Sequence, residues 1–167
     1  MKKIVVILLS ALACCTMFIG CSNSSANQEQ HLSVYSFSGE DEQFAISNGV
    51  IVLNSTEETF YGGDLKEKQD KLSDIAAYTK TFYVMSGNEK KVLMSFVVED
   101  MTGGTVNISG DIGKISGDIM TKIGTDELQN NLFFELKTTD LNGEENEYQL
   151  QLTVTEVTEK ADEIMSV

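Results

Sequence analysis

Alternation of apolar and polar residues with a period of two dominates residues 32–157 and predicts β-strands. In the clearest case, one predicted face carries Leu132, Phe134, Leu136 and Thr138 and, after a turn at residues 140–143, Tyr148, Leu150, Leu152 and Val154. The opposite face is polar except for Phe133. One apolar and one polar face is the pattern of an antiparallel sheet that is covered on one side. We therefore expect a hairpin here.

Turn residues predict two more hairpins. Asn48-Gly49 is the strongest two-residue hairpin signal, because both turn positions need positive φ. This hairpin would place Phe44, Ile46, Ile51 and Leu53 on one face. Residues 78–85 and 91–98 form the other predicted hairpin, around Ser86-Gly87-Asn88. Residues 92–98 are apolar on both faces, so we expect them to form a central strand.

The pentapeptide Ile-Ser-Gly-Asp-Ile occurs at residues 108–112 and again at residues 115–119. A two-residue turn at Gly113-Lys114 would pair the copies as a hairpin and place all four isoleucines on the buried face. Asp111 and Asp118 would then lie diagonally on the other face, where they could share a Ca²⁺ ion. Ca²⁺ takes six to eight oxygen ligands, and the local sequence does not supply the rest. We favour the plain hairpin and predict no metal site.

About eight short strands at this spacing predict an all-β fold, an antiparallel β-sandwich of general immunoglobulin-like form. We also consider one short helix near Asp64, which could be capped by Asp64 with Glu67 three residues on. Gly62-Gly63 could equally mark a turn between strands. We expect the sandwich to span residues 32–157 and to be followed by a C-terminal tail at residues 158–167.

The first twenty residues differ from the rest of the chain. Two lysines precede an apolar run from Ile4 to Ile19, and the chain turns polar after Gly20-Cys21. A positive start, an apolar middle and a small residue at the end are the layout of an export signal. We expect residues 1–20 to be a signal peptide and residues 21–31 to be a polar tether.

Phe18-Ile19-Gly20-Cys21 resembles the lipobox of bacterial lipoproteins, in which a short apolar stretch runs directly into a cysteine. The resemblance implies a diacylglycerol thioether on Cys21, cleavage before it, and anchoring at the extracytoplasmic face of the bacterial cell membrane. The family prefers Leu where Phe18 stands. Cys14 is a rival acceptor that would strand Met17–Ile19 in water. An uncleaved helix from Ile4 would reach only the lower end of the range of about 17–25 residues that a membrane span needs.

Charge and residue usage exclude several functions. The chain has 12 basic residues, all lysine, and 26 acidic residues, for a formal net charge of −14. Such acidity argues against nucleic acid, whose phosphates need neutralising cations. His31 is the only histidine and lies at the end of the tether. A Ser-His-acid triad and histidine-based zinc sites are therefore not expected, and we predict no catalytic residue and no cofactor.

Sugar binding by stacking would have to use Tyr35, Tyr61, Tyr83 or Phe133, since the chain has no tryptophan. The stretch from Phe37 to Phe44 is similar to an F-x-G-E segment that opens small, uncharacterised β-sandwich lipoproteins of Gram-positive bacteria. That resemblance implies a fold and no activity. We predict a non-enzymatic, lipid-anchored envelope protein that is a protein-interaction or structural module. The alternative is a small-molecule or glycan-binding lipoprotein associated with a transporter.

Overall fold

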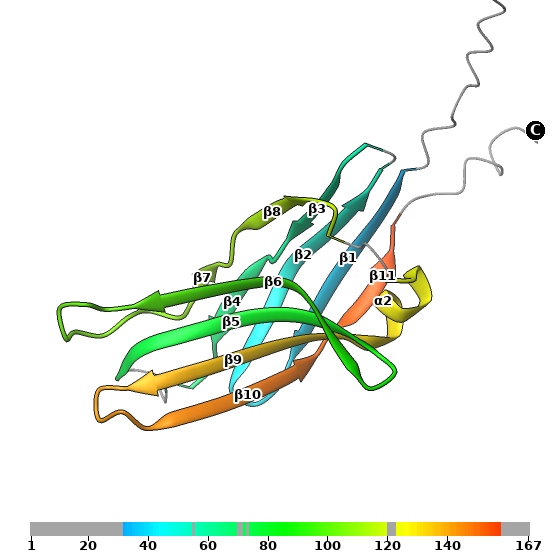
Figure 1. Cartoon of the computed structure of the whole chain (residues 1–167). Helices are drawn as coiled ribbons and strands as arrows, with labels where there is room; N and C mark the ends of the chain where they lie inside the picture. Colours follow the sequence, from blue (N-terminus) through cyan, green and yellow to red (C-terminus); the bar gives the residue numbers. More distant parts are fainter. Residues whose placement is uncertain (1–31, 55, 70–71, 73, 120–122, 158–167) are drawn as a thin grey trace, which may run out of the picture.

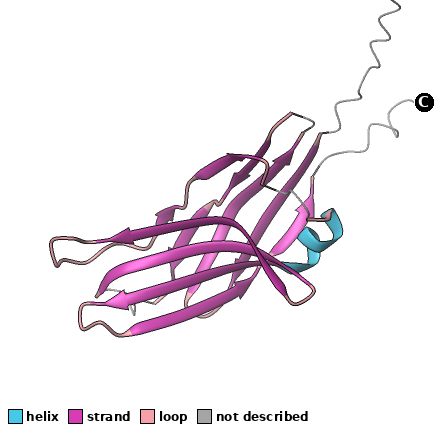
Figure 2. Cartoon of the chain, in the orientation of Figure 1, coloured by secondary structure: helices cyan, strands magenta, loops and turns pink. Residues whose placement is uncertain are grey.

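The computed structural model of the chain describes residues 32–54, 56–69, 72, 74–119 and 123–157. Within these residues, eleven strands form two antiparallel sheets and one short helix packs at an end, so the predicted all-β sandwich is confirmed (Figure 1, Figure 2). Two pairs of short strands, β3 (Glu58–Tyr61) with β4 (Asp64–Glu67) and β7 (Gly110–Asp111) with β8 (Lys114–Gly117), each continue one line, which leaves nine extended segments, close to the eight predicted.

Sheet A contains β1 (Ser33–Glu40), β2 (Phe44–Leu53), β3 (Glu58–Tyr61), β4 (Asp64–Glu67), β7 (Gly110–Asp111), β8 (Lys114–Gly117) and β11 (Thr153–Glu156). Its order is β11-β1-β2-β3-β8, with β4 between β2 and β7. Sheet B contains β5 (Ile75–Ser86), β6 (Glu89–Glu99), β9 (Leu132–Asp140) and β10 (Glu145–Gln151) in the order β10-β9-β5-β6. The helix α2 spans Thr125–Asn131.

A chain of phenylalanine rings joins the two sheets across the core. Ring centroids are 5.3 Å apart for Phe37 and Phe60 in sheet A, 5.0 Å for Phe60 and Phe82, and 5.0 Å for Phe82 and Phe134 in sheet B. Phe44 meets Phe134 edge-on at 5.6 Å. All five side chains are buried. Aromatic pairs of this kind contribute about 0.5–1.5 kcal/mol each beyond the burial of their surface.

Both hairpins predicted for sheet B are confirmed. Ser86 pairs with Glu89, so Gly87-Asn88 is a two-residue turn, with Gly87 at φ +62°. β9 and β10 join at residues 140–144, where the Asp140 carboxylate accepts the backbone N–H of Asn142 and of Glu144 at 2.8 Å each. These backbone hydrogen bonds hold the pKa of Asp140 below its usual value.

Two expectations for these strands are wrong. β6 is an edge strand of sheet B and not a central one, and its outward Val92 and Val97 are 55% and 72% exposed. The segment after Tyr148 is not a single strand. β10 ends at Gln151, the backbone N–H of Leu152 donates to the carbonyl of Leu132, and the chain then crosses to sheet A as β11. Val154 packs on the core from that sheet.

Asn48-Gly49 is not a hairpin turn, since β2 runs through it as one strand of ten residues. Phe37 pairs with Gly49 and Gly39 pairs with Ile46, so β2 carries one residue more than β1 over this stretch. Asn48, at φ +59°, lies in this β-bulge. The extra residue shifts the alternation by one position. The predicted buried face is therefore confirmed, with Phe44 and Ile46 before the bulge and Ile51 and Leu53 after it.

The repeated pentapeptide does not fold back on itself, which corrects the predicted hairpin. Asp111 pairs with Asp64 and Lys114 pairs with Tyr61, so β7 and β8 extend in line along β4 and β3. The line is continuous because Gly62 N–H donates to the Gly113 carbonyl and Ile112 N–H to the Gly63 carbonyl, each at 2.9 Å. The isoleucines of both copies still pack on the core, as predicted: Ile108, Ile112, Ile115 and Ile119.

The corrections at Asn48-Gly49 and at the repeated pentapeptide share one cause. A line of irregular backbone, here called the crease, crosses sheet A. Asn48-Gly49, Gly62-Gly63 and Ile112-Gly113 lie side by side on three neighbouring lines of strand. Gly63 has φ +75°, and a Cβ there would lie 2.1 Å from the Ser47 carbonyl oxygen. The glycines therefore permit close backbone approach within a bent sheet. They do not reverse the chain, although Gly62-Gly63 and Ile112-Gly113 separate β3 from β4 and β7 from β8.

The helix considered near Asp64 is also wrong, because Asp64–Glu67 is β4. The helix is α2 instead, between β8 and β9. The Glu127 carboxylate accepts the Gly124 N–H at 3.3 Å and the Ser86 hydroxyl at 2.6 Å, and Leu128 is fully buried. A helix of about two turns thus closes that end of the sandwich.

Candidate interaction surface

The outer face of sheet B is the surface with the most varied chemistry. Its side chains alternate with the buried ones on each strand and follow from the strand register. They are Glu145, Glu147, Gln149 and Gln151 on β10; Phe133, Glu135, Lys137 and Thr139 on β9; Ala77, Thr79, Thr81, Tyr83 and Met85 on β5; and Lys90, Val92, Ser95, Val97 and Glu99 on β6.

Tyr83 is the centre of this face and is only 1% exposed, although it points away from the core. Its ring stacks on Phe133 with centroids 5.5 Å apart and planes at 13°. The Lys90 ammonium lies 4.1 Å from the ring centroid, and the Gln149 amide donates to the phenol oxygen. Burial raises the pKa of Tyr83. These contacts cover the aromatic ring from β6, β9 and β10 together.

A ladder of ion pairs crosses the same face and is made of Lys90, Glu135, Lys137 and Glu147. Lys90 Nζ lies 2.5 Å from a carboxylate oxygen of Glu135, whose side chain is 8% exposed. Lys137 lies 3.7 Å from Glu135 and 3.3 Å from Glu147. Its hydrogen bond to Glu147, with the charge of Glu135, raises the pKa of Lys137. The buried Glu135 carboxylate thus has cationic partners from an edge strand and from its own strand.

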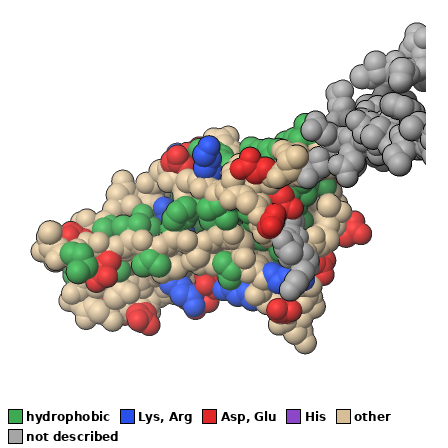
Figure 3. All heavy atoms as spheres, turned by 45° about the horizontal axis from the view of Figure 1, so that its top comes forward, with side chains coloured by type: hydrophobic (Ala, Val, Ile, Leu, Met, Phe, Trp, Pro, Cys, Tyr) green, Lys and Arg blue, Asp and Glu red, His purple; other side chains and the backbone are tan. Residues whose placement is uncertain are grey.

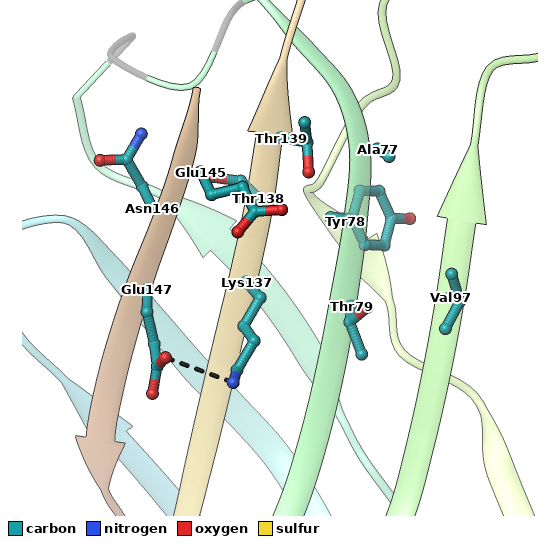
Figure 4. Close-up of a pocket in the computed structure, with 10 residues that line it drawn as sticks. All are labelled: Ala77, Tyr78, Thr79, Val97, Lys137, Thr138, Thr139, Glu145, Asn146 and Glu147. Carbon is teal, nitrogen blue, oxygen red and sulfur yellow. Dashed lines mark ion pairs between the residues drawn. The ribbon is translucent and has the colours of Figure 1, made fainter. Parts of the chain in front are cut away.

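A shallow depression of about 500 Å³ lies beside this ladder (Figure 4). It is lined by Ala77, Tyr78, Thr79, Val97, Lys137, Thr138, Thr139, Glu145, Asn146 and Glu147. These residues come from all four strands of sheet B. They offer hydroxyl, amide and carboxylate groups, one ammonium group and a small apolar surface. Such a lining suits hydrogen bonding to a polar ligand or to an extended backbone.

Exposed apolar side chains gather on β6 and just after it. Val92, Val97, Val98 and Met101 are 55%, 72%, 37% and 86% exposed. Apolar side chains form a row along the long axis of the molecule in Figure 3. Contiguous exposed apolar surface is a mark of interaction sites, whereas isolated exposed residues need no explanation.

Lys80 lies on the inner face of sheet B and is only 4% exposed. Its ammonium is 4.7 Å from the centroid of the Tyr78 ring, and it forms no ion pair with any described residue. Burial lowers the pKa of Lys80 to about 8, and the charge of Asp111 acts in the opposite direction. Lys80 was not predicted from the sequence. The available signal was a lysine in register with Tyr78 and Phe82 on the apolar face of the strand.

The aromatic residues considered for sugar stacking are not brought together as a group. Tyr35 is buried in the core, and Tyr61 is half-buried on sheet A. Burial and the carboxylates of Asp111 and Asp64 raise the pKa of Tyr61. Only Tyr83 and Phe133 meet, and they stack on each other.

Asp111 and Asp118 are not diagonal neighbours across a hairpin, because their segments lie in line. Seven residues of extended chain separate them by roughly 20 Å. The Asp111 carboxylate accepts the Gly113 N–H at 2.6 Å. Among the residues that the structure describes, no group of three or more His, Cys, Asp or Glu side chains is arranged to hold a metal ion.

Cys21, the predicted lipid attachment site, and His31 lie outside the described residues. In the described part of the chain, no helix is long and apolar enough to cross a membrane. Comparison with known protein families, with curated proteins and with solved structures finds no match to this chain.

Proposed function

We propose that the protein is a lipid-anchored, extracytoplasmic envelope protein that works as a non-enzymatic protein-interaction module. The observation that supports the interaction role is the unpaired edge of sheet B at β6, which exposes Val92 and Val97 next to a polar, hydrogen-bonding sheet face. Long edge strands with exposed apolar side chains are templates for pairing with another chain. Most soluble domains protect such edges.

The anchor rests on the resemblance of Phe18–Cys21 to a lipobox. Two acyl chains on Cys21 would hold the protein firmly, because each buried methylene contributes about 0.8 kcal/mol and one chain alone binds only marginally. The short tether then keeps the domain near the bilayer, while the acidic surface is repelled by anionic lipid. The domain would be displayed close to the membrane but not embedded in it.

The non-enzymatic role rests on the chemistry of the chain. Its only histidine is His31, in the predicted tether. Lys80, whose lowered pKa would suit a nucleophile, lies inside the sandwich, where a substrate has no direct access. Activity of the purified protein against a panel of esters, glycosides and peptides would contradict this part of the proposal.

The anchor is tested by the intact mass of the protein extracted from membranes. We expect a chain that starts at residue 21 and carries the added mass of a diacylglycerol and an acyl group. Cys21→Ser should move the protein out of the lipidated membrane fraction, while the matched variant Cys14→Ser should leave it there. Recovery of the wild-type chain with residues 1–20 attached would refute the anchor.

A second candidate function is binding of a small molecule or glycan. The depression of about 500 Å³, with its hydroxyl, amide and carboxylate lining, favours it. A ligand that binds the folded state raises the apparent stability by RT ln(1 + [L]/Kd). We would screen sugars and small metabolites by thermal shift, with Thr139→Trp to fill the depression and Leu141→Ser, in the turn after β9, as the matched control. A shift lost only in Thr139→Trp would support this candidate over the first.

A further inference from the structure

Five strands lie at the edges of the two sheets, with β7 and β8 in one line, and they differ in what they expose. The outward side chains of β10 are two glutamates and two glutamines, and β8 and β11 expose mainly lysine, serine, threonine and glutamate. β6 is the exception among the described edges, because its exposed side chains include Val92, Val97 and Val98. We propose that β6 pairs edge to edge with β6 of a second copy of this chain, antiparallel and about a twofold axis at Ser95.

A β-bulge gives β6 the symmetry that this pairing needs. Phe82 pairs with Met94 and Tyr83 pairs with Val92, so Leu93 is an extra residue. In a regular strand, residues five apart point to opposite faces. The bulge instead puts Val92 and Val97 on the same outer face.

The antiparallel register then matches the faces along the whole strand. With Ser95 opposite Ser95 of the second copy, Val92 lies opposite Val97 and Lys90 lies opposite Glu99, each of them twice. Leu93 and Met94 together face Phe96 of the second copy, so the two bulges compensate each other. Every outward residue meets an outward residue, as direct pairs in an antiparallel ladder must.

Charge selects this orientation. The chain carries a formal net charge of −14, so two copies repel unless their contact brings opposite charges together. β6 begins Glu89-Lys90-Lys91, with a net charge of +1, and ends at Glu99, which is followed by Asp100. Antiparallel pairing places each cationic end against an acidic end, whereas parallel pairing would oppose like charges.

Lys90 keeps its intramolecular contacts unless its side chain turns. One donor hydrogen of its ammonium bonds Glu135 of its own chain at 2.5 Å. That bond and the Tyr83 ring place the ammonium over β5 and β9, on the side of β6 away from the free edge, so the partner's glutamate is reached through a different Lys90 rotamer. This inference deepens the proposed function by naming the partner, but it does not need the lipid anchor to be correct.

The test is disulfide trapping in the full chain, expressed with its own leader in cells. Direct partners in an antiparallel ladder have Cα atoms about 4.5–5.5 Å apart, inside the range of about 4.4–6.8 Å that a disulfide spans. Ser95→Cys should therefore give a dimer on a non-reducing gel after mild oxidation. Glu147→Cys, at the middle of the other edge of sheet B, is the matched control. The unmodified chain sets the background from Cys14, Cys15 and Cys21.

Disruption of the pairing completes the test. In the Ser95→Cys background, Val97→Lys should lower the dimer yield about tenfold, because it places a cation opposite Val92 near Lys90. Leu141→Lys, a similarly exposed site in a turn, should leave the yield unchanged. Equal yields from Ser95→Cys and Glu147→Cys, or no effect of Val97→Lys, would overturn the pairing. Trapping is scored in membrane and soluble fractions alike, so an unlipidated protein would refute the anchor and leave this result readable.

Discussion

Sheet A and sheet B depart from a regular sheet in different ways. Sheet A keeps an apolar inner face and places its irregularity in the backbone, at the crease through Asn48-Gly49, Gly62-Gly63 and Ile112-Gly113. Sheet B has two short hairpins and its own register shifts, at Ile75/Ala77 in β5 and at Leu93 in β6, but it differs from sheet A chiefly in its buried polar side chains. Of the five buried polar side chains among the described residues, four belong to sheet B: Lys80, Thr81, Glu135 and Thr138.

The backbone irregularity of sheet A affects the shape of the sandwich, whereas the polar side chains of sheet B affect the chemistry of its surface. The crease lets sheet A bend over the core, and its bulge keeps apolar residues inward on both sides of the bend. Sheet B instead carries partly buried ionic and aromatic contacts across its outer face, from Lys90 to Glu135 and from Gln149 to Tyr83. Substitutions should therefore cost most in sheet A where they touch the backbone, and in sheet B where they change a side-chain charge or hydroxyl.

The largest expected effect is at the crease. Gly63→Ala would force an L-residue into φ +75° and place its Cβ 2.1 Å from the Ser47 carbonyl oxygen. The left-handed conformation costs about 1–2 kcal/mol and the overpacking about 1–3 kcal/mol. We expect the free energy of unfolding to fall by about 4 kcal/mol, measured by urea titration.

Gly87→Ala in the β5–β6 turn of sheet B is the matched control. Gly87 has a similar φ of +62°, but a Cβ there would meet no atom within 4 Å. Gly87→Ala should therefore lower the free energy of unfolding only by the cost of the left-handed conformation, about 1 kcal/mol. Equal losses in the two variants would show that crowding at the crease is not what requires Gly63.

Sheet B was the more predictable half of the fold because two of its three strand pairings are local, whereas the pairing of β5 with β9 joins segments about 50 to 65 residues apart. Each of its hairpins joins neighbouring segments through a short turn, so alternation and turn residues suffice to place Gly87-Asn88 and residues 140–144. The edge position of β6 was not predictable. A strand that is apolar on both faces is typical of a buried centre, and nothing local indicates that one face meets solvent or a partner.

The hairpin predicted at Asn48-Gly49 in sheet A was wrong because the same residue types occur in tight turns and in β-bulges. Asn48-Gly49 supplies positive φ in either setting, and only the strand alongside decides between them. The repeated pentapeptide pairs with residues about 50 positions earlier, which no local pattern shows. The inward faces were nevertheless predicted correctly, since burial of Ile and Phe is fixed by composition and alternation. The ladder of ion pairs among Lys90, Glu135, Lys137 and Glu147 depends on three strands at once and was not predicted from the sequence.

The second effect concerns the charge inside sheet B. Lys80 is 4% exposed and has no ion-pair partner among the described residues. Burying an unpaired ion costs several kcal/mol, and replacement of buried ion pairs by apolar side chains of similar volume has stabilised proteins by about 1–4 kcal/mol. We expect Lys80→Met to raise the free energy of unfolding by about 3 kcal/mol at pH 7. Lys66→Met, at an exposed site on sheet A, should change it by less than about 0.5 kcal/mol. Destabilisation by Lys80→Met would mean that the ammonium makes a favourable contact.

The lowered pKa of Lys80 predicts that the free energy of unfolding depends on pH. Burial lowers the pKa of Lys80 from 10.5 to about 8 in the folded protein. Between these values the unfolded chain binds more protons than the folded one, so stability rises with pH. We expect a gain of about 2 kcal/mol from pH 7.5 to pH 10, below the range where the buried tyrosines, with their raised pKa values, titrate. Thermal unfolding at constant ionic strength measures it. Lys80→Met should abolish this rise, and a rise that persists in the variant would assign it to other groups.

The smallest effect tests a hydroxyl on the same inner face. Thr138 is 2% exposed, and its Oγ1 has no hydrogen-bond partner among the described residues. An unsatisfied buried polar group costs about 1–3 kcal/mol, and an apolar replacement of the same shape removes that cost. Thr138→Val should therefore stabilise the protein by about 1 kcal/mol in urea titration, whereas Thr139→Val, its neighbour on the outer face, should have almost no effect. A loss of stability at Thr138 would indicate a water or ligand bound to that hydroxyl from the adjoining depression, and sheet B would then owe its buried polar groups to binding rather than to folding.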